Sequence, residues 1–358
     1  MNLNLFLNRG IDHILMTAGR FYIRNREGRA FLARFLPRIR KSAAIRSRYE
    51  KDGLSVPSFL IASIASQCNL HCTGCYARAG GFCESTAALS DLGTAGWESI
   101  FSEAATLGIP FILLAGGEPF MRRDVIDAAA RTRDIVFPVF TNGTLIDDDC
   151  LRLLDRSRNI IPVFSLEGEA KETDIRRGEG VYAAILRAMN RLQEKGILFG
   201  VSVTVTKENL RTVASPSYLS GLRELGCGLV VYVEYIPVSE GTAHLAPDQK
   251  DLEELAKATS EFKKHRNDMI ILSFPGDEEA MGGCLASGRG FFHINADGGA
   301  EPCPFSPFAR HHLTECSILD VLRSDYFVQL RELAEHAGPH TGGCTLFKHR
   351  DEVSALNG

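Results

Sequence analysis

The sequence predicts an α/β protein centred on a partial (β/α)6 TIM-like barrel, with helices before it and a small cysteine-containing module after it. Three observations support this fold class. From residue 58, short runs that are apolar on both faces alternate with helical segments, which is typical of a buried parallel sheet. Polar, glycine-rich stretches follow these runs, where such barrels carry their active sites. From residue 282, long periodic elements give way to Gly, Pro and Cys.

Composition and charge are those of a soluble globular protein. The chain has 358 residues, 45% hydrophobic and 23% charged, with a net charge of −4. No run approaches the roughly 20 apolar residues that span a bilayer, and no positive region precedes the apolar N-terminal part, so we expect no secretory signal. We therefore expect a cytoplasmic protein whose ten cysteines bind metal or do chemistry, and no nucleic-acid partner.

The first segment, residues 1–57, is predicted to form basic amphipathic helices. Residues 1–51 contain twelve Lys and Arg against three Asp and Glu, a net of +9. Apolar residues at helical spacing interleave with arginines over 11–51, and Pro37 is expected to break the helix. We favour packing against the bottom or side of the barrel. The alternative is peripheral contact with an anionic membrane, presenting a lipid-like substrate.

The barrel core, residues 58–240, is predicted from six strand-like runs separated mostly by helices. With their following loops, the strands span 59–66, 110–119, 136–144, 160–168, 197–206 and 229–238. The helices span 90–108, 123–133, 147–157, 180–196 and 216–225. Ser90 is the expected N-cap of the first, and Gly108 its end. Residues 241–281 connect the core to the terminal module through a helix at 248–266 and a short strand at 270–274.

Three cysteines follow the first predicted strand in "SQCNLHCTGCY": Cys68, Cys72 and Cys75. A zinc site usually pairs C-x2-C with further ligands nearby, and neither His71 nor Cys83 completes a familiar zinc spacing. A cubane [4Fe–4S] cluster needs four ligands, so three thiolates leave one iron open to a small molecule with amine and carboxylate donors. On spacing alone, zinc, an open cubane and a chance cluster all remain.

The motifs after the later strands narrow these alternatives. "GGEP" (116–119), "TNGT" (141–144) and "SLEG" (165–168) follow the second, third and fourth predicted strands, and "DIRRGEGVY" (174–182) precedes a helix. In this order, over residues 58–345, the chain resembles the radical S-adenosylmethionine (SAM) superfamily. The resemblance implies a [4Fe–4S] cluster held by the three cysteines and SAM. The residues it places at the cofactor are Tyr76, Gly116, Gly117, Glu118, Pro119, Thr141, Asn142, Ser165, Arg177 and Thr204.

Individual roles follow from the same resemblance. The backbone and acid of "GGEP" would meet the methionyl ammonium group of SAM, where Glu118 supplies a charge partner. Arg177 would reach the SAM carboxylate, with Arg176 as the alternative. Thr204 or Thr206 would lie near the adenosine. The chain departs from the family pattern at Gly74, where an aromatic residue is frequent, and at Glu167, where aspartate is frequent.

A second cysteine set lies in the terminal module, residues 282–358. "FHINADGGAEPCPF" resembles the G-x4-C hairpin of Twitch and SPASM extensions, but the late C-x2-C of a full SPASM module is absent. We therefore expect one auxiliary [4Fe–4S] cluster, on Cys284, Cys303, Cys316 and Cys344. A zinc site with the same ligands, or a three-thiol cluster without Cys316 or Cys344, are the alternatives. The remaining thiols, Cys83, Cys150 and Cys227, are expected to be buried and structural.

The resemblance implies an enzyme that cleaves SAM reductively and uses a 5′-deoxyadenosyl radical to abstract hydrogen from a substrate. That substrate is unassigned: a small molecule, a ribosomal peptide or a lipid. A reductant protein, ferredoxin or flavodoxin, is the implied partner. Glu167, Glu234 and Tyr235 are the candidate catalytic residues, unless they are core-edge residues satisfied by hydrogen bonds. The competing class is a non-catalytic scaffold or sensor that binds metal through both cysteine sets.

Overall fold

The computed structural model describes residues 18–19, 22, 25–83, 91–265, 269–276, 278, 283–336 and 344–357. Its centre is a ten-stranded sheet with the order β10-β9-β8-β1-β2-β3-β4-β5-β6-β7. The strands are β1 (Phe59–Ala65), β2 (Phe111–Gly116), β3 (Phe137–Thr141), β4 (Ile160–Ser165), β5 (Gly200–Val205), β6 (Leu229–Glu234), β7 (Ile270–Phe274), β8 (His293–Ile294), β9 (Gly299–Glu301) and β10 (His311–His312). Strands β1 to β7 run parallel to their neighbours, which confirms the predicted partial barrel.

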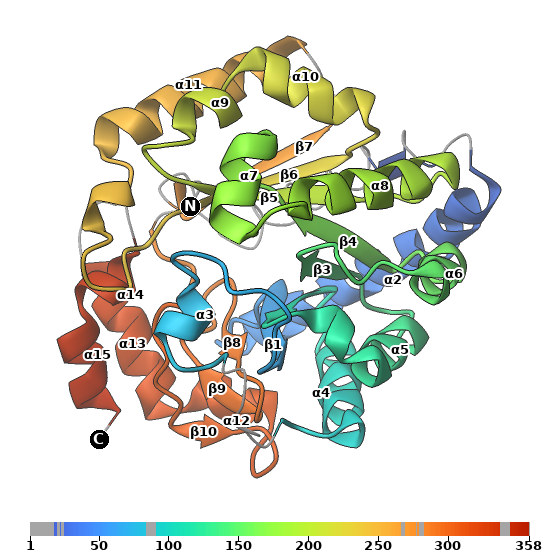
Figure 1. The fold of residues 1–358 in the computed structure, drawn as a ribbon. Coiled ribbons are helices and arrows are strands. Elements are labelled where there is room, and N and C mark those ends of the chain that lie inside the picture. The colour runs from blue at the N-terminus through green and yellow to red at the C-terminus, as the bar shows by residue number, and fades with distance from the viewer. Residues whose placement is uncertain are drawn as a thin grey trace.

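Helices surround this curved sheet, and the C-terminal elements gather beside β1 (Figure 1). Before and within the barrel they are α2 (Arg26–Lys51), α3 (Tyr76–Ala79), α4 (Thr94–Thr106), η1 (Pro119–Met121), α5 (Arg123–Arg131), α6 (Asp148–Arg156), α7 (Ala170–Arg177), α8 (Val181–Glu194), α9 (Leu210–Val213), α10 (Pro216–Glu224), η2 (Ala243–Leu245) and α11 (Gln249–His265). After it come α12 (Ile318–Arg323), α13 (Asp325–His336), α14 (Thr345–Lys348) and α15 (Arg350–Leu356). No helix among the described residues is long and apolar enough to cross a membrane.

The sheet extends further than six β/α units. Strand β7, predicted as part of a connecting segment, pairs in parallel with β6 and is a seventh barrel strand. The barrel does not close, because β7 ends the sheet on one side while β8 pairs with β1 on the other, and aromatic rings lie between these two sides. Phe291 stacks on Phe59 with ring centroids 5.1 Å apart and meets Phe274 edge-on at 5.6 Å.

Helix α2 covers the N-terminal ends of the strands, which is the packing that the sequence analysis favoured over membrane contact. The predicted break at Pro37 is wrong, because α2 continues through it from Arg26 to Lys51. Phe35 and Ile39 on either side bury against Val136, and this packing offsets the backbone hydrogen bond that proline lacks. Most of the predicted helical residues 11–24 lie outside the described residues.

Two further predictions concern element boundaries. Ser90, the expected N-cap, lies outside the described residues, and α4 begins at Thr94 after Gly93. Gly108 follows the end of α4 with a φ of +76°, which is the left-handed conformation expected there.

The terminal module shares the barrel's sheet and core. Strands β8 and β9 form the predicted hairpin, turning at Gly298 and leading to Cys303, and β8 pairs in parallel with β1. Buried residues of this module, such as Phe292 and Phe327, belong to the same apolar cluster as the barrel interior and its helices. The hairpin is therefore fixed relative to the end of β1 and the cysteine loop.

Candidate functional site

The first cysteine loop lies at the C-terminal end of β1. Cys68, Cys72 and Cys75 are half-buried free thiols that line one large cavity. Gly74 turns the loop with a φ of +67°, and a Cβ there would lie 2.7 Å from the Tyr235 hydroxyl. The unusual glycine of this motif is therefore required by its backbone conformation and by the tyrosine that occupies the adjacent space.

The "GGEP" segment packs directly on this loop. The Gly117 amide donates to the Ala65 carbonyl at 2.7 Å, and the Glu118 amide donates to the Gln67 carbonyl at 2.8 Å. A Cβ on Gly117 would lie 2.0 Å from the Gln67 oxygen, one residue before Cys68. Only glycine allows the two backbones to approach this closely.

The Glu118 side chain joins the ends of β2 and β3. Its carboxylate is 1% exposed and accepts hydrogen bonds from the Phe120 amide at 3.0 Å, the Thr141 hydroxyl at 2.8 Å and the Asn142 amide at 2.8 Å. Burial raises its pKa, and these donors oppose the rise. Asn142 in turn donates to the Asn69 side chain at 2.8 Å. The acid expected to face an ammonium group thus ties three loops together.

Glu167 forms an ion triad with the two arginines of "DIRRGEG". Its carboxylate is 1% exposed, lies 2.6 Å from an Arg176 guanidinium nitrogen, and accepts from Arg177 Nε at 2.8 Å. Burial alone would lower the pKa of Arg177, but Glu167 and the Cys72 thiol raise it. Arg176 also donates to the Thr73 carbonyl at 3.2 Å. Glu167 therefore anchors cationic groups beside the cysteine loop.

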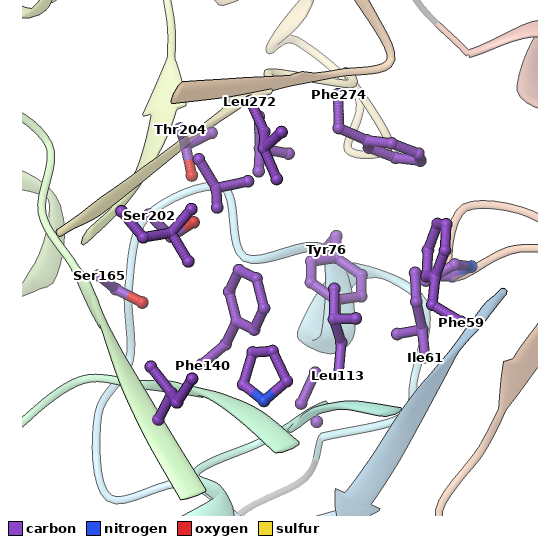
Figure 2. Close-up of a pocket in the computed structure, with 18 of the residues that line it drawn as sticks. Phe59, Ile61, Tyr76, Leu113, Phe140, Ser165, Ser202, Thr204, Leu272 and Phe274 are labelled. Atoms are coloured by element: carbon purple, nitrogen blue, oxygen red, sulfur yellow. The ribbon is translucent and has the colours of Figure 1, made fainter. Parts of the chain in front are cut away.

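Small polar side chains from β4 and β5 point into the same cavity. Figure 2 shows Ser165, Ser202 and Thr204 on one side of it, opposite Ile61 and Phe59 of β1. Thr206, the alternative to Thr204, instead accepts from the Asn209 amide in the following turn. Of the two threonines, Thr204 is the one that lines the cavity.

Two acids and a tyrosine close the opposite side. Glu234, Tyr235 and Glu278 all line the cavity, and the Tyr235 hydroxyl has no hydrogen-bond partner among the described residues. Burial, with a contribution from Glu234, raises the pKa of Glu278 to about 7, although the Leu285 amide donates to it at 3.0 Å. The sequence prediction missed Glu278, whose only local signal is its place in the acidic run "DEE".

Tyr76 lies between the two cysteine sets. Its ring packs on Phe305 at 5.4 Å, and its pKa is raised by burial and by the nearby Cys75, while a hydrogen bond with Ser63 lowers it. The Ser63 hydroxyl is also hydrogen-bonded to the His293 ring at 2.8 Å, and that ring is hydrogen-bonded to the Glu301 carboxylate at 2.6 Å. A buried hydrogen-bond chain thus connects the cavity wall with the terminal hairpin.

The second cysteine set is only partly assembled. Cys303 and Cys344 share a hydrogen bond and, in addition to burial, Cys284 raises the pKa of Cys303 and Cys344 raises the pKa of Cys284. Burial raises the pKa of Cys284 well above its ordinary value. Cys316 lies apart: its thiol donates to the His312 carbonyl at 3.3 Å, and its electrostatic neighbours are acids, not thiols. The arrangement favours the three-thiol alternative over the predicted four-cysteine set.

One thiol assigned a structural role is not isolated. Cys83 lines the cavity and shares a hydrogen bond with Cys68, which raises the pKa of Cys68 together with burial. Among the described residues, no three Cys, His, Asp or Glu side chains converge on a point suited to a single metal ion. A cubane distributes its ligands over separate irons, so the three half-buried thiols on one wall suit such a cluster. The glycines beside the cysteine loop leave room for SAM. The adjacent guanidinium groups provide positive charge for its carboxylate.

Comparison with known proteins agrees with this geometry. Residues 63–215, which carry the cysteine loop and the motifs after β2 to β4, match the Radical SAM superfamily. Over residues 63–215 the chain is a member of the Radical SAM superfamily.

Relatives of this radical SAM chain include Fe-coproporphyrin III synthase of Methanosarcina barkeri, 28% identical over 64% of this chain and 59% of the synthase. PqqA peptide cyclase of Gluconobacter oxydans is 27% identical over 70% of each chain. Streptococcus suis SuiB bound to S-adenosylmethionine shares the fold, with a TM-score of 0.66 and 20% identity over 82% of this chain and 72% of SuiB. The aligned region thus spans less than two thirds of the length of Fe-coproporphyrin III synthase.

Proposed function

We propose that this chain cleaves SAM reductively at a [4Fe–4S] cluster held by Cys68, Cys72 and Cys75. When bound, the cluster and SAM would supply a one-electron cleavage of SAM to methionine, coupled to removal of a hydrogen atom from a substrate C–H bond and release of 5′-deoxyadenosine. The main support is the convergence of the three thiols, the "GGEP" backbone and the arginine pair on one cavity.

The chain's own residues position the reactants. Both oxygens of Glu118 already accept hydrogen bonds, so we assign the SAM ammonium mainly to the backbone of Gly116 and Gly117. Arg177, fixed to Glu167 through Nε and Nη2, presents its remaining nitrogen, Nη1, toward the cysteine loop and suits a carboxylate. Ser165 and Thr204 offer hydroxyls to the adenosine side. The apolar side chains of the cavity wall limit the access of water to the reacting atoms.

The acids across the cavity suit proton transfer. Glu278 has a pKa of about 7, so it can accept or donate a proton near neutral pH. Glu234 and Tyr235 stand beside it on the cavity wall. We assign these three residues, and not the ion-paired Glu167, to contact with the substrate.

The second cysteine set would hold one auxiliary [4Fe–4S] cluster on Cys284, Cys303 and Cys344. Such a cluster supplies an electron acceptor for a substrate radical when bound. We further propose ferredoxin or flavodoxin as the electron donor and the cytoplasm as the location, since a reducing compartment keeps these thiols free.

Anaerobic reconstitution with iron and sulfide tests the proposal. With dithionite and SAM, the protein should release 5′-deoxyadenosine, measured by chromatography. Cys72→Ser should abolish this product, whereas Cys150→Ser, which alters a buried thiol away from the cavity, should not. A wild-type protein that binds iron fully and yields no 5′-deoxyadenosine would contradict the proposal.

A further inference from the structure

The interior of this barrel is a cavity of about 510 Å³. In closed (β/α)8 barrels, layers of branched side chains fill the corresponding space. Here the side chains of Phe59, Ile61, Leu113, Phe140 and Leu272 surround an open centre, as Figure 2 shows. The same cavity reaches from the cysteine loop at one end to helix α2 at the other.

The two ends of the cavity differ in chemistry. All charged side chains that line it among the described residues belong to the loop end: Arg78, Glu118, Arg176, Arg177, Glu234 and Glu278. The end toward α2 is lined mainly by apolar side chains, including Phe31, Phe111 and Ile161. Burial of a polar group there without a hydrogen-bond partner is strongly unfavourable. This end therefore disfavours a peptide backbone or a carboxylated ring and suits an aliphatic chain.

The cavity is long enough for such a chain. Its lining runs from Leu198, two residues before β5, to Thr204 near the end of that strand, six residues apart. At about 3.3 Å per residue, this is about 20 Å. SAM would occupy the loop end of that length, so a chain of on the order of ten carbons fits below it, given C–C bonds of about 1.5 Å.

A cationic pocket of about 90 Å³ adjoins the apolar end. Five arginines and one acid line it: Arg34, Arg38, Arg133, Arg156, Arg158 and Glu27. Acidic partners neutralise three of these arginines: Asp134 lies 2.9 Å from Arg38, Asp127 3.6 Å from Arg156, and Asp155 2.7 Å from Arg158.

Among the described residues no acid pairs with Arg34 or Arg133, and after the three ion pairs and Glu27 are counted the pocket keeps a net charge of +1. Guanidinium groups suit phosphate and carboxylate groups because their N–H donors match the spacing of the anionic oxygens. Phe31 and Phe35 line both the cationic pocket and the barrel cavity. Their rings stack with centroids 5.3 Å apart. A chain bound at both places would have to pass beside these two rings.

We propose that the substrate is an anionic amphiphile, an inference that rests on the SAM chemistry proposed above. Its phosphate or carboxylate head binds at the Arg34–Arg133 pocket, and its aliphatic chain extends through the barrel toward the cysteine loop. The hydrogen removed by the radical then comes from an aliphatic carbon near the far end of the chain.

Calorimetric titration tests this binding mode without any SAM cleavage. The full chain is titrated with octyl, decyl and dodecyl phosphate, each below its micelle concentration. Each added methylene should tighten binding about fourfold, or about 16-fold for two. Inorganic phosphate should bind far more weakly, and the matching alcohols should retain the chain-length dependence with lower affinity. Affinity that does not change with chain length would overturn the inference.

Variants separate the two parts of the site. Arg34→Ala with Arg133→Ala should weaken alkyl phosphates at least tenfold and leave the alcohols unchanged. Arg187→Ala, at an exposed position on α8, is the matched control. Leu113→Trp should fill the cavity and abolish binding of both ligand series, and Ile161→Phe is a milder filling variant if the first folds poorly. Alkyl phosphate binding that survives cavity filling would place the chain elsewhere.

The binding assay and the SAM assay give separable results. Release of 5′-deoxyadenosine without alkyl phosphate binding would refute the amphiphile and leave the proposed reaction standing. Chain-length-dependent binding without SAM cleavage would support the cavity assignment and refute the reaction.

Discussion

Gly117 offers the sharpest test of how the cysteine loop is positioned. An alanine Cβ at this residue would lie 2.0 Å from the Gln67 oxygen and 2.4 Å from its carbonyl carbon. Both are rigid backbone atoms, so relief requires the two loops to separate by about 1 Å or more. The separation would weaken the bonds that the Gly117 and Glu118 amides donate, now 2.7 and 2.8 Å long.

The size of the effect follows from these contacts. Two backbone hydrogen bonds contribute about 1 kcal/mol each, and forcing a methyl group into a packed site costs about 1–3 kcal/mol. Gly117→Ala should therefore lower the free energy of unfolding by about 3–5 kcal/mol. Because Gln67 precedes Cys68, a displacement of about 1 Å should also slow 5′-deoxyadenosine formation by about 100-fold.

Urea unfolding of the iron-free protein, followed by circular dichroism, measures the first effect, and product release from the reconstituted protein measures the second. Gly221→Ala is the matched control, since Gly221 lies within α10 and a Cβ there meets nothing within 4 Å. It should stabilise by up to about 1 kcal/mol through helix propensity. An unchanged urea midpoint together with full SAM cleavage in Gly117→Ala would refute the loop packing described here.

Three further predictions concern thiols and a buried acid. Cys83→Ser should retain the first cluster and SAM cleavage. Loss of about four irons in this variant would identify Cys83 as a ligand and contradict the open iron of that cluster. Cys303→Ser should remove the auxiliary irons, measured by iron assay, whereas Cys316→Ser should leave them; equal losses would restore the four-cysteine set. In the folded protein the pKa of Glu278 is about 7, compared with an ordinary value of 4.5. Protonation of this carboxylate therefore favours the folded state, and its ionisation lowers the stability as the pH rises from 4.5 to 7. In iron-free protein, Glu278→Gln should therefore match the stability of the wild type near pH 4.5 and exceed it by about 3 kcal/mol at pH 8. If the urea midpoints of variant and wild type changed in parallel with pH, the raised pKa would be disproved.

The barrel was predictable because its signals are local. Apolar runs of the length of β1 to β6 and the loops after them are written in consecutive residues, so the alternation alone gives the order of the sheet. Strand β7 has only five residues, and its sequence does not reveal that it pairs with β6. The continuity of α2 through Pro37 was missed because the burial of Phe35 and Ile39 against β3 is a tertiary contact.

The candidate site was predictable by residue type more than by role. "GGEP" identified Glu118, but its three donors come partly from the end of β3, which the strand's own sequence does not specify. The separation of Cys316 from Cys303 likewise depends on how β10 pairs with β9. The open barrel interior depends on which side chains face inward on seven strands, and no single stretch of sequence encodes it.

The two departures from the family pattern each have a compensating neighbour. At Gly74 the space next to the loop is occupied by the Tyr235 hydroxyl from the end of β6, so the tyrosine supplies cover that an aromatic residue in the motif would give. Glu167 has one methylene more than aspartate, and its single oxygen Oε1 reaches both Arg176 and Arg177. Arg176 then holds the cysteine loop through Thr73. Glu167 therefore positions both the cysteine loop and the two arginines beside it. Its removal would leave two buried guanidinium charges without a partner next to the thiols.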